Sequence, residues 1–186
     1  MGRRGRSYFD KQGHLYFITT TVLDFEKVFS FGNKYYEIVI SNLKQQLNQY
    51  QTSLYAYVLM PNHFHLIVHT PVGKSLSDFM RDLKKYSSIQ IKEELENDGK
   101  QEFINILMMK SGFGGYKLWM DRFDDVILYT DKVIQTKVDY IHNNPVKAGL
   151  VKMVTDWKYS SARNYYLGDH SVIKVGIWEP AAPSQV

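Results

Sequence analysis

The chain has 186 residues, 44% of them hydrophobic, and this length suits one compact domain better than two. It contains no cysteine, which excludes disulfides and thiolate zinc sites, so any metal must be held by nitrogen or oxygen ligands. A net charge of +4 is compatible with a polyanionic partner but does not require one.

No apolar segment approaches the roughly 20 residues that cross a bilayer, and the basic N-terminus is not followed by a signal-type apolar stretch. We therefore expect a soluble cytoplasmic protein. The whole chain, residues 1–186, is predicted to form a single domain with a basic N-terminal arm at 1–13 and a C-terminal tail at 168–186.

The first half of the chain predicts a strand, a helix and a hairpin. Residues 14–25 (HLYFITTTVLDF) are rich in aromatic and β-branched types, which favours a strand. Apolar residues recur at helical spacing over 33–51, which indicates an amphipathic helix. Two strand-like runs, 54–60 and 63–70, are separated only by Pro61 and Asn62, so an antiparallel hairpin is the simplest interpretation.

The second half predicts two further helices. Residues 75–97 read as a long helix that ends near Asp98 and Gly99, and 103–109 fit either a strand or a buried helical turn. The glycine-bearing stretch 110–119 is a loop, and 121–129 fit a strand or irregular structure. Thr130 or Asp131 can cap a helix that runs to about Asn143, where Asn144 before Pro145 is expected to end it.

This order of elements predicts the fold class. A strand, a helix, a hairpin, a helix, a possible strand and a helix fit an α+β, ferredoxin-like (RRM-like) sandwich with helices on one face of an antiparallel sheet. The other face of the sheet would then be free for ligands.

Two histidines interrupt the apolar run YVLMPNHFHLIVHT at residues 57–70. Because side chains at i and i+2 of a strand share a face, His63 and His65 project side by side and could close on one divalent cation. His69 has the same parity but lies on the order of 13 Å from His65 along a strand, too far to join them. The alternative is that both are hydrogen-bonded structural histidines.

A tyrosine in the last helix is the second candidate. Ile134, Val138 and Ile141 define an apolar stripe, and Tyr140 lies off that stripe, on the side shared with Thr136, Lys137 and, if the helix persists that far, Asn144. A tyrosine outside the core is available for chemistry. The alternative is an ordinary surface tyrosine.

Four segments carry a resemblance to a known family. MPNHFH (60–65) resembles the histidine-hydrophobic-histidine motif of the HUH-type single-tyrosine transposases, within them the REP-associated tyrosine transposases and IS200-like relatives. VDYIHNNPVKAGLV (138–151) resembles the segment with their nucleophilic tyrosine, and LWMDRFDD (118–125) and WKYSSARNYY (157–166) resemble flanking segments more loosely. The likeness covers about residues 14–167. In relaxases, another HUH group, the tyrosine precedes the histidines, unlike here.

The resemblance implies a transposase mechanism. Tyr140 would attack a phosphodiester of single-stranded, hairpin-associated DNA and form a 5′-phosphotyrosine link, with Mg²⁺ or Mn²⁺ held by His63, His65 and Asn144. The family commonly works as a homodimer. Basic residues would contact the DNA, three in the arm and four elsewhere: Arg3, Arg4, Arg6, Lys84, Lys85, Arg122 and Lys147.

Two other functions remain open from the sequence. A metal-dependent nuclease would use water, leave Tyr140 as a bystander and cut DNA without a covalent adduct. A non-catalytic module that binds DNA or RNA hairpins would be indifferent to chelators and would not break strands.

Overall fold

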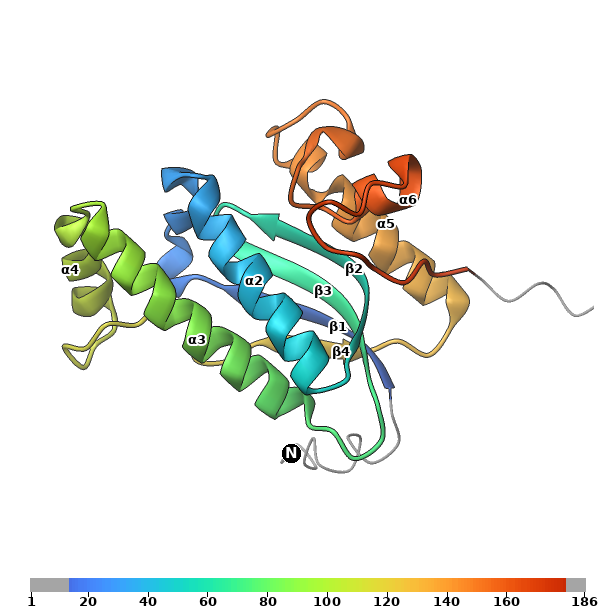
Figure 1. The fold of residues 1–186 in the computed structure, drawn as a ribbon, viewed down its shortest axis with the longest axis horizontal. Helices are drawn as coiled ribbons and strands as arrows, with labels where there is room; N and C mark the ends of the chain where they lie inside the picture. The colour runs from blue at the N-terminus through green and yellow to red at the C-terminus, as the bar shows by residue number, and fades with distance from the viewer. Residues whose placement is uncertain (1–13, 180–186) are drawn as a thin grey trace, which may run out of the picture.

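The computed structural model describes residues 14–179, whose elements alternate between strands and helices (Figure 1). In chain order they are β1 (His14–Thr21), the 3₁₀ turns η1 (Leu23–Phe25) and η2 (Val28–Phe31), α2 (Asn33–Gln49), β2 (Ser53–Met60), β3 (His63–Thr70), α3 (Leu76–Asn97), α4 (Gln101–Lys110), β4 (Asp124–Ile127), α5 (Asp131–Lys147), η3 (Val154–Asp156) and α6 (Ala162–Leu167).

The four strands form one antiparallel sheet in the order β2-β3-β1-β4. With α2 between β1 and β2, and α3 between β3 and β4, this is the topology of a ferredoxin-like β-α-β-β-α-β unit. The predicted α+β class is therefore confirmed. The predicted hairpin is also present, with Pro61 and Asn62 at its turn.

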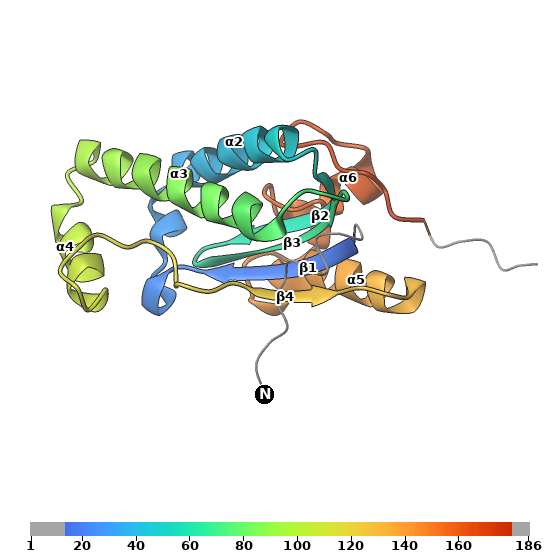
Figure 2. The same cartoon turned by 90° about the horizontal axis from the view of Figure 1, so that it is seen from below.

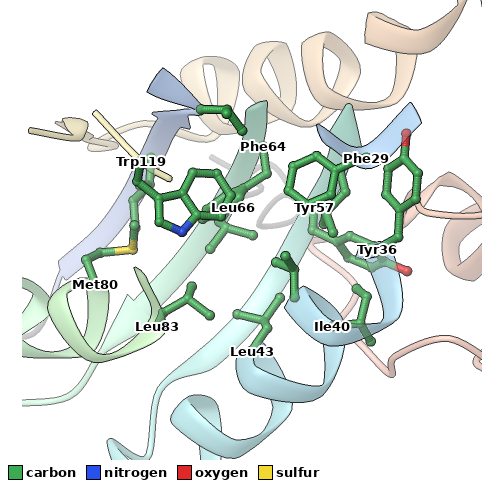
Figure 3. Close-up of a cluster of buried hydrophobic side chains, with 14 of the residues drawn as sticks. Phe29, Tyr36, Ile40, Leu43, Tyr57, Phe64, Leu66, Met80, Leu83 and Trp119 are labelled. Carbon is green, nitrogen blue, oxygen red and sulfur yellow. The ribbon is translucent and has the colours of Figure 1, made fainter. Parts of the chain in front are cut away.

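Helices α2 and α3 cover one face of the sheet (Figure 2). Alternate residues of the strands, such as Ile18, Phe64 and Leu66, bury their side chains against this helix pair. Figure 3 shows the cluster, in which Leu43 of α2 and Leu83 of α3 meet side chains from the sheet and the indole of Trp119. This is the larger of two apolar clusters and holds the sheet in register.

The opposite face is not free, which corrects the expectation that all helices lie on one side. The residues of alternate parity, among them Phe17, Val58 and Ile67, form a second apolar cluster with the α5 stripe Ile134, Val138 and Ile141. Figure 2 shows α5 on the side of the sheet away from α2 and α3. The sheet carries apolar residues on both faces, so the predicted stripe of α5 had a surface to pack on.

One boundary differs from the sequence-based expectation, and two open assignments are decided. The first strand ends at Thr21 because Asp24 and Phe25 have left-handed φ angles of 52° and 59°, which no strand accommodates. Residues 103–109 belong to helix α4, the helical one of the two alternatives. Residues 121–129, which fitted a strand or irregular structure, contain the four-residue strand β4.

The largest correction concerns the end of α5, which continues through Pro145 to Lys147. Proline at this position lacks the N–H that would bond to the Ile141 carbonyl, but it lies only two residues from the helix end and its ring is buried. Buried packing and the remaining bonds of the last turn, such as Ala148 N–H to the Asn144 carbonyl at 3.0 Å, outweigh the loss. Asn144 therefore keeps helical geometry one turn after Tyr140.

The chain ends were expected to be a basic arm at 1–13 and a tail at 168–186. The arm, with Arg3, Arg4 and Arg6, lies outside the described residues. The described part of the tail runs beside β2, where Gly176 N–H donates to the Leu54 carbonyl at 2.9 Å. Among the helices of residues 14–179, none combines the length and apolar composition that a membrane span requires.

Candidate active site

The two histidines of β3 lie side by side on the sheet face that α5 partly covers. Their ring centroids are 4.9 Å apart with the planes at 73°, so the edge of one ring meets the face of the other. Phe17 of the neighbouring strand stacks on His65 at 5.4 Å. The i, i+2 spacing thus produces the predicted juxtaposition.

Helix α5 brings Tyr140 to this pair. The Tyr140 ring centroid lies 5.2 Å from that of His65 and 5.9 Å from that of Phe17, although 75 residues separate Tyr140 from His65. The tyrosine is 38% exposed, so its phenol is open to a macromolecular substrate while one side of its ring is held. His63, His65 and Tyr140 therefore form one cluster within a single chain.

Burial keeps both imidazoles neutral. It lowers the pKa of His63, and it lowers the pKa of His65 to about 3, with the positive charge of Lys137 acting in the same direction. A neutral imidazole offers a nitrogen lone pair, which is the form that binds a metal ion. At neutral pH both histidines are therefore in the protonation state that a metal ligand needs.

One nitrogen of the pair lacks a partner. Nε2 of His65 is buried and makes no hydrogen bond within the described part of the chain, while Nδ1 of the same ring lies 2.8 Å from the Thr19 hydroxyl. An unpartnered buried nitrogen is costly, and a cation on this lone pair would remove the cost. The residues present thus fit a divalent ion held by imidazole nitrogen.

Asn144 is the predicted third ligand. It lies four residues after Tyr140 on α5, hence on the same helix face, and is half-buried. Within residues 14–179 no cluster of three histidine, aspartate or glutamate side chains could hold an ion. The amide oxygen of Asn144 is a group that could join the two imidazole nitrogens. The role of Asn144 stays a prediction.

Two lysines flank the tyrosine. Lys137 Nζ lies 4.4 Å from the ring centroid of Phe17 and 5.6 Å from that of Tyr140, and Lys147 Nζ lies 5.9 Å from the Tyr140 centroid. Lys147 is among the predicted DNA contacts and Lys137 is not, although the position of Lys137 three residues before Tyr140 indicates the same helix face. Two positive charges therefore lie beside the Tyr140 ring.

The other predicted DNA contacts are not gathered at this cluster. Lys84 and Lys85 lie on α3, across the sheet from Tyr140, and Lys84 Nζ donates to the backbone carbonyls of Met120 and Asp121 at 2.7 and 3.0 Å. Arg122 is exposed just before β4. A path along α5 would not meet Lys84 or Lys85, and their contacts with DNA stay predictions.

A sequence profile described as "Transposase IS200 like" matches residues 18–144, which is more than half of the chain and includes His63, His65 and Tyr140. This chain belongs to the IS200-like transposase family. The match begins in β1 and ends in α5 at Asn144, so it spans the sheet and most of the helix α5 that packs on it.

Two curated relatives of this transposase carry a more specific name. A Haemophilus influenzae protein named among the REP-associated tyrosine transposases is 31% identical over 150 residues, 81% of this chain and 80% of the relative. The REP-associated tyrosine transposase of Escherichia coli K12 is 31% identical over 107 residues, 57% of this chain and 52% of its own length.

A solved structure shares the fold of the transposase. It is a REP-associated tyrosine transposase bound to a REP hairpin, with a TM-score of 0.63 at 22% identity, and the match covers 94% of this chain and 93% of that one. The predicted family is confirmed by the profile and the relatives together, and the fold by this structure.

Proposed function

We propose that this transposase cuts and rejoins single-stranded DNA through a covalent bond to Tyr140. The observation that supports the proposal is the cluster itself. A half-exposed phenol lies against a neutral imidazole pair, between two lysine ammonium groups, in a chain of the IS200-like transposase family. No other tyrosine of the described residues has its ring against His65.

The chemistry follows from the residue types. The Tyr140 oxygen attacks phosphorus, a tyrosine O–P bond forms and the bond from phosphorus to the 3′-oxygen breaks. The phenol loses its proton and the leaving 3′-oxygen gains one, so the products are a 5′-phosphotyrosine and a free 3′-hydroxyl. Because the phosphodiester energy is kept in the covalent link, attack by another 3′-hydroxyl reverses the step and rejoins DNA without ATP.

His63, His65 and Asn144 would hold a Mg²⁺ or Mn²⁺ ion. When bound, such an ion supplies charge that polarises the nonbridging phosphate oxygens. Lys137 and Lys147 of the chain itself would attract the phosphate and orient it toward the phenol. The neutral state of the histidines, which burial favours, keeps their lone pairs available.

The DNA substrate is proposed to carry a hairpin. The support is the solved relative, whose title describes a complex with a REP hairpin, together with the two REP-associated relatives. The homodimer that the resemblance implied and the cytoplasmic location stay predictions. Since His65 and Tyr140 meet within one chain, the proposed attack does not require a partner's helix.

A labelling experiment tests the covalent step and its polarity. The protein is incubated with Mn²⁺ and hairpin-bearing single strands labelled at the 3′ end or, in a parallel set, at the 5′ end, and is then denatured. Label at the 3′ end should stay with the protein, because the fragment downstream of the cut retains the 5′-phosphate, and label at the 5′ end should be released. Tyr140→Phe should give neither adduct nor cleavage.

Each alternative function predicts a different result. If Tyr140→Phe still cuts the strand at the wild-type rate and no label is retained, a water-using nuclease replaces our proposal. If the protein binds hairpins equally well in a chelator and never breaks a strand, the non-catalytic module replaces it.

A further inference from the structure

The residue before the first histidine fixes the protonation of that imidazole. His63 Nδ1 lies 2.7 Å from Oδ1 of Asn62. The amide cannot be turned around, because Nδ2 of Asn62 donates to the Phe25 carbonyl at 3.0 Å, and an oxygen in its place would face that carbonyl oxygen. An amide oxygen only accepts, so Nδ1 of His63 must carry the proton and Nε2 is left as a lone pair.

The turn holds Asn62 firmly. Besides its two side-chain bonds, the Asn62 carbonyl accepts from Val22 N–H at 2.8 Å. The residue is thus tied through backbone and amide to the segment that follows β1. Its orientation is set before any ligand arrives, which is what a support for a metal-binding imidazole requires.

Thr19 of β1 can play the same part for His65. Nδ1 of His65 lies 2.8 Å from Oγ1 of Thr19, while Nε2 of the same ring is buried and makes no hydrogen bond within residues 14–179. A hydroxyl can accept as well as donate, so Thr19 can take the Nδ1–H proton in a hydrogen bond and leave the buried Nε2 as the lone pair.

We propose that Asn62 and Thr19 are positioning residues that lock His63 and His65 as Nδ1–H tautomers, so that two Nε2 lone pairs are presented to one divalent cation. The inference deepens the proposed function. It rests on that function only for what the bound ion would do, because the tautomers follow from hydrogen bonds within the protein. It also assigns a role to the asparagine of the sequence PNHFH, which periodicity and motif reading left unexplained.

The first test needs no DNA and no metal. Two-bond ¹H–¹⁵N correlation spectra of the cation-free protein at neutral pH distinguish the two neutral tautomers of each histidine. We expect the Nδ1–H form at His63 and His65. An Nε2–H form at either residue of the wild-type protein would overturn the assignment for that residue.

Variants connect the tautomer to the ion. Asn62→Ala removes the acceptor, so the His63 spectrum should change toward the Nε2–H form and the Mn²⁺ dissociation constant, measured by electron paramagnetic resonance titration, should rise roughly 10- to 100-fold. Asn62→Asp keeps an acceptor oxygen and should retain the Nδ1–H form. Thr19→Val should weaken Mn²⁺ binding in the same manner, and Thr19→Ser should restore it.

A matched control separates this effect from general damage. Asn143→Ala removes another asparagine, which is exposed on α5 and donates from its side chain to the Asp139 carbonyl, and should change neither tautomers nor Mn²⁺ affinity. If Asn62→Ala is folded by circular dichroism and binds Mn²⁺ as the wild type does, Asn62 is not a positioning residue. The outcome is independent of the labelling experiment: a protein with locked tautomers and no DNA adduct would refute the proposed function alone.

Discussion

The rings of His65 on β3 and Tyr140 on α5 lie 5.2 Å apart, edge to face. This contact exists because the sheet is apolar on both faces: one is covered by α2 and α3, and the other receives α5 with its stripe of Ile134, Val138 and Ile141. The packing of that stripe turns the next face of α5, with Tyr140, toward the histidines. Core packing and candidate chemistry are therefore set by the same helix.

Lys137 should contribute to catalysis, although it is not among the DNA contacts predicted from the sequence. Replacing it by alanine removes the ammonium nearest to Phe17 and Tyr140, so we expect the rate of strand cleavage to fall about tenfold or more. Lys137→Arg should recover part of the rate. The measurement is single-turnover cleavage, with Lys132→Ala, an exposed lysine of the same helix, as control. Equal rates for the two alanine variants would remove Lys137 from the mechanism.

Variants of Asn144 should show whether its amide oxygen is a ligand of the divalent ion. If its oxygen is a ligand, Asn144→Ala should raise the Mn²⁺ concentration needed for half-maximal cleavage, and Asn144→Asp, which keeps an oxygen, should raise it less. The measurement is cleavage rate against Mn²⁺ concentration. An unchanged Mn²⁺ dependence in the alanine variant would leave the two histidines without this third ligand.

Acid should destabilise the fold through His142, which is fully buried on α5. Burial lowers its pKa from 6.5 to about 4, against the opposing effect of Asp139. Below pH 6.5 this histidine binds a proton in the unfolded chain but stays neutral in the folded chain. The stability present at higher pH is therefore lost as the pH falls toward 4. The expected loss from this residue between pH 7.5 and 5 is about 2 kcal/mol.

Urea unfolding of the wild type and of His142→Gln at several pH values measures this loss. Glutamine does not titrate but can still donate to the Ser161 hydroxyl, which His142 Nε2 contacts at 2.9 Å. The two proteins should differ by a constant amount above pH 7.5, and the wild type should lose more stability below it. Parallel curves down to pH 5 would contradict the assignment.

Ser161 should be important for stability, because its buried hydroxyl joins α5 to β2. It accepts from Tyr57 N–H at 2.9 Å, lies 3.2 Å from the Tyr57 carbonyl as a donor and contacts His142. Ser161→Ala leaves buried polar groups without partners, so we expect the free energy of unfolding to fall by about 1–3 kcal/mol. Ser41→Ala, at an exposed position, is the control and should stay within about 0.5 kcal/mol.

Much of the fold could be read from local patterns. The hairpin around Pro61 and Asn62, the capped helix after Thr130 and the α+β order are signalled by residues close together in sequence, so propensity and periodicity suffice. The end of α5 was misjudged because Pro145 acts locally against a helix, while its buried ring and the final turn act for it. Such a balance depends on packing that no short window contains.

The amino-acid sequence by itself determined which residues could do chemistry: His63 and His65 on one strand face, Tyr140 off an apolar stripe, and a family resemblance that joins them. Only the tertiary structure decided that these groups meet within one chain, that Lys137 joins them, and that Asn62 and Thr19 hold the imidazoles. The reason is that the period of a strand or helix fixes the face on which a side chain lies, whereas the groups that face it come from other segments brought there by burial of two apolar clusters.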